Sequence, residues 1–167
     1  MAAQPFTNAM DNLGVQKNTQ QALINGLWPQ YKSLETDVTF TNGTNENGDY
    51  NGTGNPSDLF TVTGTVEMVI IGICTTTVTG GSSTIEVGTA INTAGLIAQT
   101  TGTDIDVNMI WHDATPDSSV EVSTAILRKI VNQDVIITVS TADVTAGVIK
   151  FIAYWNPISV DGNVTIA

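Results

Sequence analysis

Positive charge is scarce in this chain. Five lysines and arginines stand against 16 acidic residues, which gives a formal net charge of −11. Nucleic acids are bound through clustered Lys and Arg side chains that neutralise phosphates, so we do not expect a nucleic-acid partner. Charged residues in total make up 13% of the chain, which is about half the usual share. The acidic surface favours solubility and repels other copies of the chain at long range.

Cysteine and long apolar runs are scarce as well. Cys74 is the single cysteine, which excludes a disulfide within the chain. It lies in an apolar run without a basic neighbour, which predicts an inert core thiol. The longest apolar run, Met68–Cys74, is too short to span a bilayer, and the N-terminus shows no secretory signal pattern. We therefore expect no membrane partner.

Residues with catalytic or metal-binding chemistry are few. His112 is the only histidine, and no nucleophile-elbow motif accompanies it. With one His and one Cys the usual zinc ligand sets cannot be built. Asp104 and Asp106 share a predicted strand face, with Asp113 and Asp117 in the next loop, but the dense oxygen spacing of a calcium loop is absent. The sequence therefore predicts no catalytic residue, no cofactor and no metal.

Most of what is present favours β-structure. Threonine and the β-branched aliphatics favour strands, while Gly and Asn supply turns. Alternating apolar residues predict strands at 37–41, 59–79, 84–89, 95–100, 104–111, 120–127, 133–141 and 148–155. The segment 41–58 is rich in Asn-Gly and predicts a long surface loop. We expect an all-β fold, a jelly-roll-like antiparallel β-sandwich over residues 37–158, followed by a short tail at 159–167.

The stretch 59–79 is the most informative. Residues 61–68 alternate between polar side chains and apolar residues or glycine, which predicts a strand with one buried face. From Val69 to Cys74 both faces are apolar, so this part of the strand needs cover on two sides. The cover would come from a neighbouring subunit or from a helix or loop of the same chain.

The first 36 residues predict an N-terminal arm. They are polar with scattered large apolar groups, and a short helix is expected between Gln16 and Asn25. Large apolar anchors in a polar segment are typical of an arm that lies on a neighbouring subunit or on another protein. The alternative is that Trp28 and Tyr31 close one end of the sandwich. The residues expected to make the arm's contacts are Phe6, Leu13, Leu27, Trp28 and Tyr31.

Four phrases carry a resemblance to a known class of proteins: TVTGTVEMVIIGICTT, TIEVGTAINTAGLIAQTT, TDIDVNMIWHDATPD and VIKFIAYWNPIS. The block from Phe60 to Pro157 that contains them resembles small jelly-roll proteins encoded among the virion genes of tailed bacteriophages. The resemblance implies an auxiliary capsid protein, called a decoration or cement protein, that sits as a trimer on the outside of the phage head. Its partners would be other copies of itself and the major capsid protein. It would be made in the cytoplasm of a bacterial host and reside on the virion surface.

A trimer would hide the second apolar face of the long strands. The residues expected at the subunit interface are Val69, Ile71, Ile73, Val148, Ile152 and Tyr154. Contacts that exist only in the assembled shell stabilise that shell over its free subunits. The alternative function is a receptor- or glycan-binding module on the virion, such as a fibre head. A glycan-active enzyme is the third and weakest hypothesis, because no aromatic-rich cleft accompanies the acidic residues.

Overall fold

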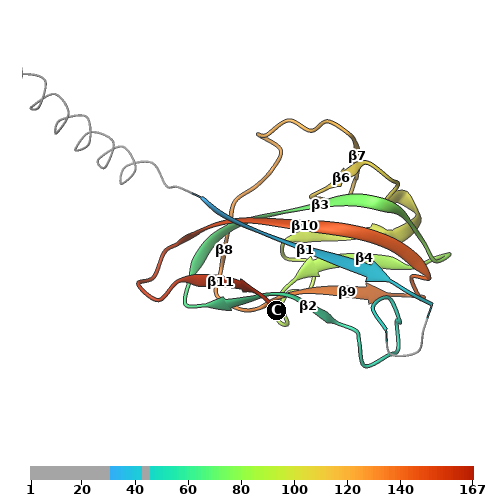
Figure 1. Ribbon diagram of the computed structural model, residues 1–167, viewed down its shortest axis with the longest axis horizontal. Helices are drawn as coiled ribbons and strands as arrows, with labels where there is room; N and C mark the ends of the chain where they lie inside the picture. The colour runs from blue at the N-terminus through green and yellow to red at the C-terminus, as the bar shows by residue number, and fades with distance from the viewer. Residues whose placement is uncertain (1–30, 43–45) are drawn as a thin grey trace, which may run out of the picture. The chain divides into compact units, whose positions relative to one another are not determined.

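The computed structural model describes residues 31–42 and 46–167, and residues 32–167 form one compact unit of two antiparallel sheets (Figure 1). The first sheet has the order β1 (Lys32–Phe40), β10 (Ala146–Pro157), β3 (Val66–Thr79), β6 (Met109–Trp111) and β7 (Asp117–Ser118), with β8 (Lys129–Val131) also paired to β3. The second has the order β11 (Asn163–Ile166), β2 (Ser57–Thr63), β9 (Val135–Ser140), β4 (Thr84–Gly88) and β5 (Ile97–Thr101). A 3-10 turn, η1 (Gly102–Asp104), follows β5. The all-β sandwich expected from the sequence is confirmed.

The strand pairing is nested, as a jelly roll requires. In chain order, the first long strand pairs with the last (β1 with β10) and the second with the second-last (β2 with β9). β3 pairs with both β6 and β8, which share one position in the sheet, and β4 pairs with β5 at the centre of the nest. These eight nested strand positions form a double-sheet jelly roll, and β7 and β11 are added at the outer edges of the two sheets.

The core lies between the two sheets and follows the two-residue period. Along β3 and β10, alternate residues are buried while those between them are partly exposed. Trp111 and Phe151 meet edge-to-face, with ring centroids 6.0 Å apart. Gly72 of β3 leaves room for both rings, since an added Cβ would lie 3.3 Å from an atom of each. The sandwich is therefore closed by its own inward-facing side chains.

The stretch 59–79 was expected to be one strand and is two. β2 ends at Thr63 and β3 begins at Val66, and the two strands belong to different sheets. Gly64 turns the chain with a φ of +64°, a conformation that glycine adopts without steric cost. The alternation of polar and apolar residues continues through this turn, because the strands before and after it each bury one face.

Other boundaries differ from the sequence prediction. β1 begins at Lys32, so five residues assigned to the arm belong to the sandwich. Residues 104–111 contain only the short strand β6, because η1 and a turn precede it. Residues 120–127 form no strand, since β8 occupies the place beside β3. The segment 159–167, assigned to a short tail outside the sandwich, supplies β11, an edge strand beside β2.

The expected helix at 16–25 lies outside the described residues. In the described part of the chain there is no helix long and apolar enough to cross a membrane.

Candidate functional site

In the first sheet, the strand position beside β3 is interrupted, because two short strands occupy it in place of one. β8 pairs with residues 66–68 of β3, and β6 pairs with Gly72 and Ile73. Between these two partners the chain makes an excursion over residues 112–128, whose one strand in the sheet is the two-residue β7, paired with β6. We call this segment the excursion. A jelly roll has one strand at this position, so the interruption creates space that a continuous strand would fill.

A pocket of about 140 Å³ lies at the interruption. Its walls come from β3, the β4–β5 connection, β5, the excursion and β8: Met68, Ile70, Ala94, Leu96, Ala98, His112, Asp113, Ala125, Ile126, Leu127 and Lys129. Lys129 closes one side, because its ammonium group donates hydrogen bonds to the carbonyls of Gly95 and Leu96 at 2.9 and 2.8 Å. Burial lowers the pKa of Lys129. Pockets for drug-sized ligands start at roughly 300 Å³, so this pocket suits waters or an ion better.

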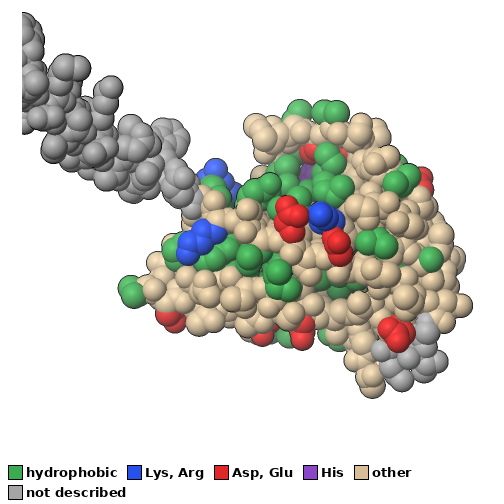
Figure 2. All heavy atoms as spheres, viewed as in Figure 1, with side chains coloured by type: hydrophobic (Ala, Val, Ile, Leu, Met, Phe, Trp, Pro, Cys, Tyr) green, Lys and Arg blue, Asp and Glu red, His purple; other side chains and the backbone are tan. Residues whose placement is uncertain are grey.

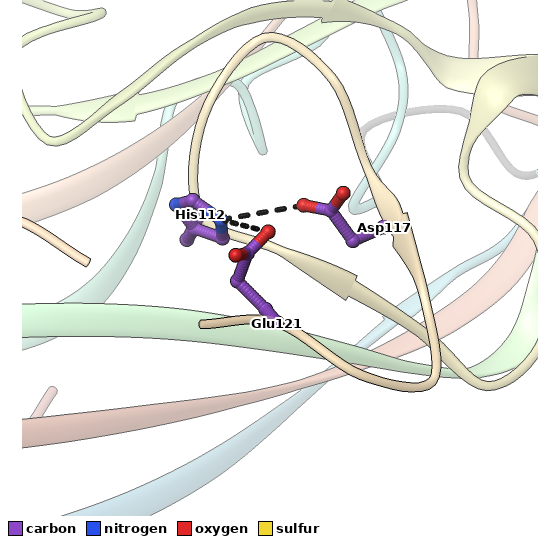
Figure 3. A group of neighbouring side chains, drawn as sticks. All are labelled: His112, Asp117 and Glu121. Atoms are coloured by element: carbon purple, nitrogen blue, oxygen red, sulfur yellow. Dashed lines mark ion pairs between the residues drawn. The ribbon is translucent and has the colours of Figure 1, made fainter. Parts of the chain in front are cut away.

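His112, Asp117 and Glu121 form a cluster beside this pocket, and their side chains point toward one another (Figure 3). We call these three residues the histidine–carboxylate cluster. Nε2 of His112 lies 3.4 Å from Oδ2 of Asp117 and 3.3 Å from Oε2 of Glu121. The histidine side chain is 3% exposed, that of Glu121 13% and that of Asp117 36%. The cluster is thus buried at the imidazole and open to solvent at one carboxylate.

The three residues of the cluster are close in sequence because a hairpin brings them together. β6 and β7 pair antiparallel, with Ile110 opposite Asp117. His112 follows β6 directly, and Glu121 follows β7 by three residues, so the chain returns both carboxylates to the histidine. The turn is held by Asp113, whose Oδ1 accepts a hydrogen bond from the amide of Thr115 at 2.7 Å.

The base of this hairpin is anchored in the core. The indole nitrogen of the fully buried Trp111 donates to Oγ1 of Thr100 at 2.8 Å. The Thr100 hydroxyl in turn lies 3.2 Å from the carbonyl of Asp113, which it reaches as a donor. His112 lies between these two anchored residues, so its main-chain position is fixed by the sandwich.

The two carboxylates perturb each other. Asp117 has a raised pKa because it shares a hydrogen bond with the Glu121 carboxyl, and burial adds to the shift. Glu121 has a lowered pKa because it receives that hydrogen bond, with further help from the backbone amide of Val122 and from His112. Two acids this close disfavour simultaneous ionisation. The cluster therefore holds either a proton or another cation most readily.

The four acids considered as calcium ligands in the sequence are not assembled into one site. Asp104 lies in η1, Asp106 in the turn that follows, and Asp113 outside the cluster. Within residues 31–42 and 46–167, the one group of three side chains that could hold a metal ion is the histidine–carboxylate cluster. Of the four acids considered from sequence, only Asp117 belongs to it.

Glu121 was missed by the sequence prediction. The reason is that residues 120–127 were assigned to a strand, whose alternation would have separated Glu121 from His112. The available signal was the spacing of one His and two acids within ten residues, separated by the turn-forming Pro116.

The predicted interface residues lie on the outer face of the first sheet. Val69, Ile71 and Ile73 of β3 and Val148 and Ile152 of β10 are partly exposed, and Tyr154 is 39% exposed. The register places Ile71 beside Ile152 and Val69 beside Tyr154. Figure 2 shows hydrophobic side chains gathered over this sheet beside a few charged ones. We call these six residues the outer stripe.

The remaining predictions concern Cys74 and the arm. Cys74 is buried, and desolvation raises the pKa of its thiol, in agreement with an inert core residue. Phe6, Leu13, Leu27 and Trp28 lie outside the described residues. Tyr31 is described, and its side chain is half-buried.

Comparison of the chain with protein-family models, with curated proteins and with solved structures gave no match.

Proposed function

We propose that this chain is a structural virion protein, a capsid decoration protein that assembles with copies of itself, most simply as a trimer, on the outside of a phage head. The observation that carries the proposal is the outer stripe. Six mostly apolar residues face outward from a sheet whose inner face already fills the core. The jelly-roll strand order agrees with the resemblance noted in the sequence, and the pocket beside the histidine–carboxylate cluster is small for a substrate.

The outer stripe has the properties of a contact surface. It lies on the two longest strands of the sheet, so its backbone is rigid and little conformational entropy is lost when a partner covers it. Lys150 lies on the same face of β10 between Val148 and Ile152, and its ion pair with Glu35, 3.3 Å apart, places neutralised charge within the stripe. Protein interfaces commonly combine apolar contacts with such polar groups.

Self-assembly is tested by placing a charge in the outer stripe. Ile152→Asp should convert the oligomer to a monomer, because an aspartate buried in an apolar contact is strongly destabilising. The measurement is the mass in solution by sedimentation equilibrium. Ile91→Asp is the matched control, since Ile91 is 81% exposed in the connection between β4 and β5. The proposed interface would be contradicted if Ile152→Asp left the mass unchanged. It would also be contradicted if the parent protein were a monomer both in solution and on the capsid.

Capsid binding is tested by removing the arm. A variant lacking residues 1–31 keeps all of β1 and the compact unit 32–167. We expect it to fold and assemble but to lose binding to heads of the corresponding phage that lack this protein. Full occupancy of the heads by the truncated protein would show that the arm is not the docking element. Binding to host cells or glycans without binding to heads would favour the receptor-binding alternative.

A further inference from the structure

We infer that the histidine–carboxylate cluster is a binding site for a divalent transition-metal ion, with Zn²⁺ as the best-fitting ion. The inference is independent of the proposed capsid role. It depends on three features of His112, Asp117 and Glu121: an unsatisfied buried nitrogen, the spacing of the three donor atoms, and their chemical type.

The first feature is the buried nitrogen. Nε2 of His112 is inaccessible to solvent and has no hydrogen-bond partner among the residues that the structure describes. A buried polar atom without a partner costs about 1–3 kcal/mol, so native structures rarely retain one without a reason. This nitrogen points at two carboxylates, both within ion-pair distance but neither in hydrogen-bond geometry (Figure 3). An ion between the three groups would satisfy it.

The second feature is the spacing. A protonated histidine paired with a carboxylate places nitrogen and oxygen about 2.7–2.9 Å apart. The observed separations, 3.4 and 3.3 Å, are both longer than this. Zinc lies about 2.0–2.2 Å from nitrogen and oxygen ligands, so two ligands at the tetrahedral angle are about 3.3–3.6 Å apart. All three donor atoms lie within 4.8 Å of one another, which a single ion can bridge with small adjustments of the exposed Asp117.

The third feature is the donor set. One neutral imidazole and two carboxylates balance the charge of a divalent ion. Imidazole is a ligand for zinc and other transition metals, whereas calcium and magnesium prefer oxygen ligands alone. Three protein ligands leave a zinc coordination position for water.

Metal binding would fix the excursion. All three ligands come from the first ten residues of that segment, and Val120 and Val122 beside Glu121 are 79% and 63% exposed. An ion would hold this apolar loop against the anchored end of β6. The expected physical consequence is local ordering of the excursion with little change in the two sheets.

The experiment uses the full chain without an affinity tag, because tag histidines bind zinc. The chelator-treated protein is titrated with ZnCl₂ and observed by NMR. His112 is the only histidine in the chain, so its imidazole signals are identified without ambiguity. We expect them to shift and to saturate at one equivalent of zinc per chain, with one zinc retained by mass spectrometric metal analysis after gel filtration.

Substitutions identify the carboxylate ligands. Asp117→Asn and Glu121→Gln should each weaken zinc binding at least tenfold, and the zinc-induced rise in Tm should shrink accordingly. Asp113→Asn is the matched control, since it is adjacent to His112 but outside the cluster. It should keep the parent affinity within about twofold, because an asparagine oxygen can still accept from Thr115.

Three results would overturn the inference. One is the absence of a His112 shift with ZnCl₂ in excess, which would leave an ion pair as the only role of the cluster. The second is equal zinc affinity in the parent, Asp117→Asn and Glu121→Gln proteins. The third is CaCl₂ binding at the cluster more tightly than ZnCl₂. The NMR titration needs only the parent protein, so it remains decisive if a variant fails to fold.

Discussion

Gly64 shows how one residue directs the chain between sheets. Its φ of +64° and its surroundings both exclude a side chain, because an added Cβ would lie 2.5 Å from Oγ of Ser159 and from Oδ1 of Asp161. The amide of Thr65 donates to Oγ of Ser159 at 2.8 Å. The Ser159 hydroxyl hydrogen-bonds Asp161 and lowers the pKa of that carboxyl. The resulting stabilisation is present above the ordinary pKa of an aspartate and is lost as the pH falls through the lowered value.

Replacing Gly64 should therefore cost more than replacing another glycine of the same conformation. Gly64→Ala should lose about 1–2 kcal/mol to backbone strain and about 1 kcal/mol more from the disturbed hydrogen bonds. Gly81→Ala is the control, because Gly81 has a φ of +62° and an added Cβ would meet nothing within 4 Å. Urea unfolding measures both. Equal losses in the two variants would mean that Ser159 and Asp161 tolerate the methyl group.

At the scale of elements, the side chain of Asn55 continues the hydrogen bonding between β2 and β9 beyond the start of β2. β2 and β9 pair from Ser57 opposite Ile137. Two residues further along, the Asn55 amide donates to the carbonyl of Val139 at 2.8 Å and accepts from its amide nitrogen at 2.9 Å. The same amide donates to the carbonyl of Tyr50 at 3.0 Å. One side chain thus replaces a strand residue and ties the preceding loop to β9.

Asn55→Ala should leave both backbone groups of Val139 without these bonds. We expect a loss of about 1–3 kcal/mol in the free energy of unfolding and faster proteolysis within residues 46–56. Asn51→Ala, at an exposed position of the same loop, should change neither by a measurable amount. Urea unfolding measures the free energy of unfolding, and limited proteolysis measures the rate of cleavage. Identical behaviour of the two variants would show that water replaces the amide at no cost.

The excursion also belongs to the element scale, and it explains a wrong prediction. Residues 120–127 have enough β-branched residues to predict a strand, but Val120 and Val122 are largely exposed. Strand propensity describes fit to a sheet surface and depends on a free place in a sheet. Here β8 and β6 already pair with two parts of the same edge of β3. Residues 120–127 therefore fold outside the sheet.

At the scale of the whole molecule, charge opposes the association that the outer stripe favours. Each chain carries a formal charge of −11, so copies repel one another until salt screens them. Screening shortens the range of this repulsion from about 10 Å at 0.1 M salt to about 3 Å at 1 M. Apolar contact persists at high salt.

Salt should therefore strengthen self-assembly. Between 0.1 and 1 M NaCl we expect the oligomer to become several-fold more stable toward dilution, measured by sedimentation equilibrium. The Ile152→Asp protein should show little response, because it lacks the apolar contact. Dissociation of the parent oligomer by salt would instead indicate that ion pairs between the subunits hold them together.

The sequence by itself determined the β-sandwich, most strand positions and the outward direction of the outer stripe, because a two-residue period assigns each side chain to a face whatever the sheet order. It also determined the inert character of Cys74. Only the tertiary structure decided the change of sheet at Gly64, the pairing of the tail strand β11 with β2, and the meeting of His112 with Asp117 and Glu121. These features depend on which segments occupy a limited number of positions beside β2 and β3. That competition is settled by packing over the whole sandwich, so a local pattern such as the spacing of His112 and the two acids does not decide it.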